Sequence, residues 1–174
     1  GLSSAHAEGK LVVLVAVNGV CLGGISLEDR PRTTARETVG LLREQGVQRV
    51  VMLTGDHERT AARVAEELGL DEYHAQLLPE EKHALIGALR GRYGVVLMVG
   101  DGVNDAPALA AADVGMAMGA AGSDTALETA DVALMADDLT KLPFAVALSR
   151  ATSRVIRQNL WVSLGVVALL IPAT

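Results

Sequence analysis

The stretch Val95-Val96-Leu97-Met98-Val99-Gly100-Asp101-Gly102-Val103-Asn104-Asp105 decides the fold expected of this chain. It opens on an apolar run of the length of a buried strand. Two glycines then flank Asp101, which permits a tight turn and a close approach of the backbone. Asn104 and Asp105 are residue types that open helices. The stretch therefore predicts a strand, a polar turn and a helix in immediate succession.

Helical and strand-like segments alternate on both sides of this stretch. The alternation predicts an α/β fold with a Rossmann-like, doubly wound parallel sheet. Ahead of it, Asn18-Gly19 joins two apolar runs, which predicts a short N-terminal β-hairpin. The hairpin strands are expected over 10–17 and 21–27, helices over 33–45, 57–68, 79–89, 104–112 and 123–129, and further strands over 50–53, 73–75, 95–99, 114–118 and 132–134.

The C-terminal segment is helical from about Asp138 and becomes apolar and uncharged over 160–174. This run is shorter than the ~20 residues that a membrane span needs, so a buried core helix is one interpretation. Three arginines precede the run, as in the positive-inside pattern of membrane proteins. Because the chain stops within the run, we expect a truncated transmembrane helix.

Composition excludes some classes of function. The net charge of −6 argues against a surface for nucleic acid, so no nucleic-acid partner is expected. The chain has one cysteine, which excludes an internal disulfide framework and a CxxC metal site. Cys21 lies in the middle of a predicted strand and is expected to be a small core residue.

A second polar group, Thr54-Gly55-Asp56, follows the strand expected over 50–53. Parallel strands deliver their carboxyl ends to one edge of a sheet, so this group and the one at Asp101 should share that edge. The Thr54 hydroxyl and the Gly55 amide suit one phosphoryl oxygen. Taken alone, the tripeptide is equally consistent with a simple turn at a strand end.

Lys82 lies in the first turn of the helix expected over 79–89. A cation there opposes the helix dipole, which indicates an anion nearby. A solvent-exposed lysine is the alternative. At the other group, Asp101 and Asp105 offer the hard oxygen ligands that Mg²⁺ prefers, beside a helix N-terminus suited to a phosphate.

In this order, Thr54-Gly55-Asp56, Pro79-Glu80-Glu81-Lys82 and the string from Gly100 to Leu109 resemble the P-type ATPases of the haloacid dehalogenase superfamily. The resemblance covers essentially the whole chain. Segments 118–124, 137–139 and 149–160 are similar to the heavy-metal-transporting subgroup. The resemblance implies an ATP-driven pump that exports a divalent heavy-metal ion through an aspartyl-phosphate, with ATP and Mg²⁺ as substrate and cofactor.

The resemblance also implies roles for single residues. The phosphoryl group is bound and its charge stabilised in such enzymes by a lysine, a threonine and the metal ion. Asp56 is expected to order the Thr54 loop. The implied residues are Asp101 and Asp105 for Mg²⁺, and Thr54, Gly55, Asp56, Lys82 and Asn104 for the phosphate and ATP, with Thr54, Asp56 and Lys82 as the catalytic set.

One departure from the family pattern concerns the phosphorylated aspartate. The family carries it in an Asp-Lys-Thr-Gly-Thr string, which does not occur in these 174 residues. We expect it upstream, together with the central strand of the sheet, so that the isolated chain should be inactive. Residues 1–28 are then the end of a nucleotide-binding domain, 29–140 a phosphorylation domain and 141–174 a linker helix entering the membrane. This implies a plasma-membrane protein with residues 1 to about 155 in the cytoplasm, in contact with membrane lipid at the C-terminus.

The transported metal is only weakly indicated. Val166 and Val167 stand where the copper subgroup has a Tyr-Asn pair, and Val167 stands where the zinc, cadmium and lead subgroup has a lysine. The run over 164–172 is more similar to the cobalt-type subgroup. Two other functions stay open: a soluble Mg²⁺-dependent phosphatase of the same superfamily, and a non-catalytic regulatory module.

Overall fold

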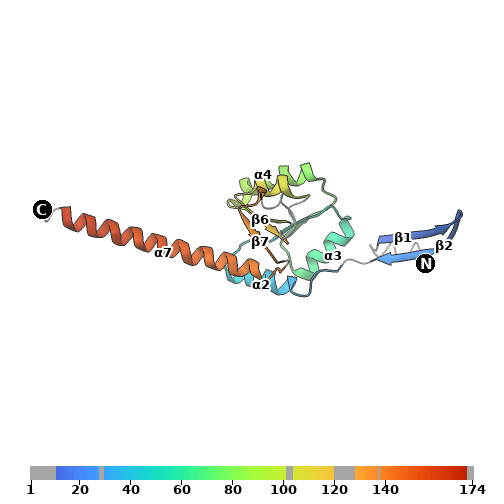
Figure 1. Cartoon of the computed structure of the whole chain (residues 1–174), viewed down its shortest axis with the longest axis horizontal. Helices are drawn as coiled ribbons and strands as arrows, with labels where there is room; N and C mark the ends of the chain where they lie inside the picture. The colour runs from blue at the N-terminus through green and yellow to red at the C-terminus, as the bar shows by residue number, and fades with distance from the viewer. Residues whose placement is uncertain (1–10, 28–29, 101–103, 120–127, 137, 172–174) are drawn as a thin grey trace.

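The computed structural model describes residues 11–27, 30–100, 104–119, 128–136 and 138–171 (Figure 1). Helices and strands alternate along the central part of the chain, as predicted. In chain order the elements are β1 (Leu11–Val17), β2 (Val20–Leu27), α2 (Ala35–Glu44), β3 (Val51–Leu53), α3 (Glu58–Leu68), β4 (Glu72–His74), α4 (Pro79–Tyr93), β5 (Leu97–Gly100), α5 (Ala106–Ala111), β6 (Val114–Met118), β7 (Val132–Leu134) and α7 (Lys141–Leu170).

The central strands are parallel, but they form two sheets where the sequence predicts one. β3 pairs with β4, and β5 pairs with β6, which pairs with β7. No pairing joins β3 to β5 within the described residues. As a consequence, Leu97 in β5 is 36% exposed, although the apolar run around it predicts a buried strand.

Helices cover both faces of the sheets, so that the order of layers is helix, sheet, helix (Figure 1). α4 and α5 pack together on one side, and α2 packs against α3 and α7 on the other. This two-sided cover agrees with the predicted α/β architecture. It also explains why strands such as β6 are apolar along their whole length, because a parallel strand is buried on both faces.

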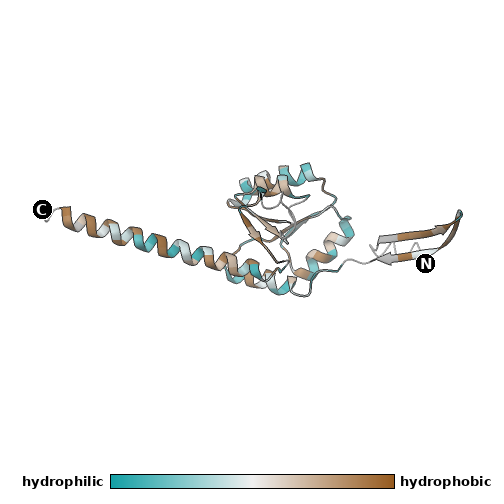
Figure 2. Ribbon diagram, in the orientation of Figure 1, coloured by the Kyte–Doolittle hydropathy of each residue, from teal (hydrophilic) through white to brown (hydrophobic). Residues whose placement is uncertain are grey.

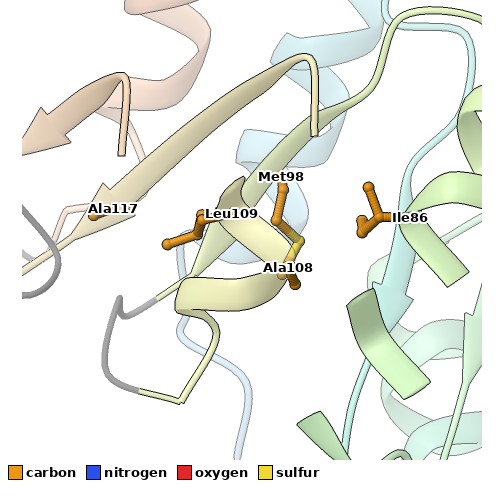
Figure 3. Packing of buried hydrophobic residues seen from close by; sticks show 5 residues of the cluster. All are labelled: Ile86, Met98, Ala108, Leu109 and Ala117. Carbon is orange, nitrogen blue, oxygen red and sulfur yellow. The ribbon is translucent and has the colours of Figure 1, made fainter. Parts of the chain in front are cut away.

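The core lies where α4 and α5 meet the larger sheet (Figure 3). Ile86 and Leu109 are each 1% exposed and are the largest fully buried side chains. Burying a side chain of this size stabilises the fold by about 2 kcal/mol. Leu53 from the smaller sheet packs against the same cluster, so both sheets share one core.

Gly115 allows the close approach of α5 to β6. A Cβ at this position would lie 2.7 Å from the carbonyl oxygen of Leu109, a distance that real Cβ contacts do not reach. The two nearest atoms, the carbonyl oxygen and carbon of Leu109, belong to the backbone, which cannot move aside as a flexible side chain can. Glycine at this point is therefore a requirement of the packing.

An aspartate joins each pair of parallel strands near their N-terminal ends. In each case the aspartate lies directly before one strand, and its carboxylate accepts a hydrogen bond from a backbone N–H at or near the start of the neighbouring strand. These contacts satisfy backbone donors at a strand end and fix the register of the two strands. They run from Val50 to Asp71 (2.8 Å), from Val96 to Asp113 (2.9 Å) and from Gly115 to Asp131 (2.8 Å).

Two of these carboxylates also contact arginines. Arg43 Nη2 donates to Asp71 at 3.1 Å, and Arg90 Nη2 donates to Asp113 at 2.7 Å. The backbone hydrogen bond from Val50, with the help of Arg43, lowers the pKa of Asp71. The hydrogen bond from Val96, with Arg90, lowers the pKa of Asp113. Both groups are therefore held as carboxylates in the folded chain.

Two segments extend away from the α/β body (Figure 1). The hairpin of β1 and β2 is antiparallel and turns at Asn18-Gly19, as predicted. Its apolar side chains are exposed, and Cys21 with them, so the prediction of a buried core cysteine is wrong. The reason is that nothing in the described residues covers either face of the hairpin.

α7 is a single helix of 30 residues. Leu142 near its start is buried, and its later turns leave the body (Figure 1). Its hydropathy is mixed along most of its length (Figure 2). Within the described residues, no helix combines the length and the apolar character needed to cross a membrane.

Most element boundaries agree with the predicted ones to within two or three residues. α4 differs most, because it runs to Tyr93 and ends at Gly94, which adopts a positive φ of 85°. The internal Gly91 does not stop it. The helix predicted over 123–129 lies almost entirely outside the described residues.

Replacing Gly115 by alanine tests the packing of α5 on β6. We expect Gly115→Ala to lower the free energy of unfolding by about 1–3 kcal/mol, because backbone must shift to admit the methyl group. Gly87→Ala is the control: no atom lies within 4 Å of its added Cβ, and alanine in a helix should stabilise by about 1 kcal/mol. Urea unfolding of both variants is the measurement, and equal stabilities would contradict the packing argument.

The aspartates at the strand ends predict an acid-dependent loss of stability. The pKa values of Asp71 and Asp113 are lower in the folded than in the unfolded chain. Their contribution is thus complete above the unfolded pKa of about 4 and disappears as the pH falls through the folded value. Unfolding should become easier between about pH 5 and pH 3. In Asp113→Asn this decrease should be smaller, and an unchanged decrease would exclude Asp113 as a contributor.

Candidate phosphate and magnesium site

The loop after β3 is held by the segment that follows β4. Thr54 N–H donates to the carbonyl oxygen of His74 at 3.0 Å, and Leu77 N–H donates to the carbonyl oxygen of Thr54 at 3.0 Å. Gln76 N–H donates to the carbonyl oxygen of Asp56 at 2.8 Å. These bonds fix the loop from Thr54 to Asp56 against the chain that leads into α4.

Within this loop, the backbone N–H of Asp56 donates to Thr54 Oγ1 at 3.1 Å. Asp56 thus contacts Thr54, but through its backbone. A hydroxyl that accepts one hydrogen bond still has its own hydrogen to donate. Thr54 is therefore oriented and keeps a donor for a phosphoryl oxygen.

Gln76 is a feature that the sequence analysis missed. Its φ of 56° is left-handed, which is uncommon for a residue other than glycine. Its side-chain amide lies 3.5 Å from His57 Nδ1, at the start of α3. No apolar periodicity or turn motif marks this position, so the sequence does not predict the left-handed conformation.

The start of α4 places Lys82. Pro79 occupies the first turn, and Glu81 Oε2 accepts a hydrogen bond from the N–H of Leu78 at 2.8 Å, which caps the helix. The backbone N–H of Lys82 donates to the carbonyl oxygen of Leu78. The lysine is thus part of a well-defined first turn.

Lys82 does lie against an anion, as its unfavourable place in the helix indicates. Its Nζ donates to Asp105 Oδ1 at 2.7 Å. The two side chains are 15% and 16% exposed, so the pair is largely removed from water. An ion pair in such surroundings is weakly screened, and removing one partner would leave the other charge uncompensated.

Asp105 stands at the N-cap of α5, and its carbonyl oxygen accepts a hydrogen bond from the N–H of Leu109 at 2.8 Å. A Cβ at Gly100 would lie 2.8 Å from Asp105 Oδ2. Glycine at the end of β5 therefore lets the carboxylate fold back over the strand end. Asn104 is exposed beside it, whereas Asp101 lies outside the described residues.

The structure thus arranges five of the predicted residues in two groups. One is the loop from Thr54 to Asp56, and the other is the pair of Lys82 with Asp105. The residues from Gln76 to Leu78 link them, because they bond to the loop on one side and lead into α4 on the other. The first group supplies a hydroxyl donor, and the second supplies a cation and a carboxylate that is partly used by that cation.

A double-mutant cycle tests the buried ion pair. Lys82→Met and Asp105→Asn should each destabilise the chain, with a coupling energy of about 1–3 kcal/mol. The control is the pair of Lys141 with Asp138, which is 4.0 Å apart and well exposed, and should show no measurable coupling. Urea unfolding of the single and double variants gives both cycles. Equal coupling in the two pairs would contradict the geometry at Lys82.

Comparison with known proteins gives the family. The model of the haloacid dehalogenase-like hydrolases matches residues 2–113. The chain is 44% identical over 159 residues to a cadmium-transporting ATPase of Staphylococcus aureus and 53% identical over 154 residues to a zinc-exporting P-type ATPase of Mycobacterium marinum. These matches cover 91% and 88% of this chain, but only 22% and 21% of the two relatives.

A solved structure agrees with them. The crystal structure of a zinc-transporting PIB-type ATPase in its E2.Pi state superposes with a TM-score of 0.79 at 46% identity, over 94% of this chain and 26% of the other. The resemblance to heavy-metal P-type ATPases that the motifs indicate is thereby confirmed, and the chain spans about a quarter or less of such proteins. With a family model that matches more than half of its residues, the chain belongs to the haloacid dehalogenase-like hydrolases.

Proposed function

We propose that the chain is the phosphoryl- and Mg²⁺-binding part of an ATP-driven pump that exports a divalent heavy-metal ion. The observation that carries the proposal is the ion pair of Lys82 with Asp105, placed where β5 ends and α5 begins. A cation held beside a carboxylate and a helix N-terminus suits a phosphoryl group that is bridged to a metal ion. The similarity to a cadmium-transporting and a zinc-exporting ATPase supports the same proposal.

The donor atoms fit Mg²⁺. Asp105 offers carboxylate oxygens and Asp101 lies four residues before it in the sequence, and Mg²⁺ uses one or two carboxylates together with waters and phosphate oxygens. Asp101 and Asp105 are the ligands that we propose. When bound, the ion would neutralise developing charge on the phosphoryl oxygens.

This chain's own residues would then orient the phosphoryl group. Thr54 donates its hydroxyl hydrogen to one oxygen, and the Gly55 amide donates to it as well. Lys82 can donate to both Asp105 and the phosphoryl group, because an ammonium has three donors. Asn104 donates from its exposed side chain. Asp56 holds Thr54 through its backbone N–H.

The phosphorylated aspartate would come from chain outside these residues, on a strand between β3 and β5. These two strands belong to separate sheets but share one core, in which Leu53 of β3 packs against the cluster that contains Met98 of β5. A strand inserted there would complete a single sheet and cover Leu97. We further propose that the hairpin of β1 and β2 ends a nucleotide-binding domain, that residues 29–140 form the phosphorylation domain, and that α7 continues into the plasma membrane from a cytoplasmic body.

The full-length protein gives the decisive experiment. With radiolabelled ATP and Mg²⁺ it should form an acid-stable phosphoenzyme, and Asp101→Asn should reduce this at least about 100-fold. Lys82→Ala should have a similar effect. Glu80→Gln, an exposed neighbour in the first turn of α4, is the control and should behave like the wild type. Normal phosphorylation in Asp101→Asn would exclude its role with Mg²⁺.

The same preparation distinguishes the remaining alternatives. Stimulation of ATP hydrolysis by zinc, cadmium or cobalt ions would identify the transported metal, and cobalt stays a prediction from the run over 164–172. Hydrolysis of small phosphate esters with no metal stimulation would favour a soluble phosphatase. No hydrolysis of either substrate would favour a regulatory module.

A further inference from the structure

Three arginines form a stripe along α7. Arg150, Arg154 and Arg157 are spaced by four and three residues, so they lie on one face of the helix. All three are exposed, and together they line a hollow of about 480 Å³. We call Arg150, Arg154 and Arg157 the arginine stripe.

The stripe has no acidic partner among the described residues. Elsewhere in the body arginines form ion pairs with carboxylates, as Arg43 does with Asp71 and Arg90 with Asp113. Arg150 makes one long contact, in which its Nη2 donates to the carbonyl oxygen of Gly46 at 3.5 Å. In a chain with a net charge of −6, an uncompensated group of three guanidinium ions is a local excess of positive charge.

The same helix face changes character towards the C-terminus. Continuing the spacing of four and three residues from Arg157 leads to Trp161 and then Leu164, which are 75% and 59% exposed. At 1.5 Å per residue, the stripe spans about 10 Å, and Trp161 follows it by about 6 Å. One face therefore presents cations, then an indole, then an aliphatic side chain.

We propose that the arginine stripe binds the phosphate of an anionic membrane lipid. Guanidinium groups bind phosphate oxygens in a bidentate manner, and tryptophan prefers the boundary between headgroups and hydrocarbon. The sequence of cation, indole and aliphatic residue along one face matches the order of layers from headgroup to acyl chain. A soluble anion would use the arginines but would leave Trp161 and Leu164 without a role.

The assignment of a lipid site to the arginine stripe rests on the proposed function, in which α7 continues into the membrane. It adds a lipid class and the residues that would recognise it. The position of the site is also defined, because Arg150 contacts Gly46, which follows the C-cap residue of α2. The anionic surface would therefore lie against that end of the body.

Trp161 provides the measurement, because it is the only tryptophan in the sequence. The chain of 174 residues is titrated with vesicles of phosphatidylcholine alone and with vesicles of equal parts phosphatidylcholine and phosphatidylglycerol. We expect a blue shift of the tryptophan emission with the anionic vesicles at much lower lipid concentration than with the neutral ones. Neither ATP nor Mg²⁺ is needed, so this result is independent of whether the protein hydrolyses ATP.

Single charge-removing variants locate the site. Arg154→Gln and Arg157→Gln should each raise the lipid concentration at half-maximal shift about fivefold. Arg36→Gln is the matched control, since it removes an exposed arginine near the start of α2, and it should leave the titration unchanged. Circular dichroism of each variant checks that helix content is retained.

Three outcomes would overturn the proposal. The first is an equal shift with neutral and anionic vesicles, and the second is an equal effect of Arg154→Gln and Arg36→Gln. The third concerns soluble phosphate. If inorganic phosphate, compared with chloride at the same ionic strength, releases the chain from anionic vesicles, the stripe is a site for a soluble anion.

Discussion

The placement of an aspartate directly before a parallel strand is the constraint on which the rest of this structure depends. Asp71, Asp113 and Asp131 each accept a backbone hydrogen bond from a residue at or near the start of the neighbouring strand, and so they set the register of both sheets from one end. A register error of one residue would exchange the buried and exposed faces of a strand. The core around Leu109 and the approach of α5 to Gly115 are possible only when that register holds.

With this arrangement, the two ends of the strands differ in the hydrogen bonds that their polar side chains already make. At the N-terminal ends, the carboxylates are used by backbone donors and by Arg43 and Arg90, which leaves them little capacity for a ligand. At the C-terminal ends, the side chains of Lys82 and Asp105 are held but keep unused donors and lone pairs. The carboxylates before the strands and the proposed ligand Asp105 thus differ in the hydrogen bonds that they already make.

The sequence predicts local features well and the joining of sheets poorly. Strands over 114–118 and 132–134 were predicted to the residue because compact apolar runs mark them, and Lys82 was expected beside an anion because its place in the helix is otherwise unfavourable. A missing central strand was expected, but its place between β3 and β5 could not be predicted, since strand pairing depends on distant residues. The aspartates before the strands were missed because aspartate is also common in ordinary turns. The left-handed Gln76 carries no signal in its residue type.

The unbroken course of α7 has a mechanical consequence. A helix of 30 residues is a stiff rod about 45 Å long, and within the described residues its contacts with the body lie in its N-terminal part, from buried Leu142 to Arg150. A tilt of about 5° at that base would move the far end by about 4 Å, given the rise of the helix. A small rearrangement around α2 would therefore move the far end of α7 by a distance comparable to the size of a side chain.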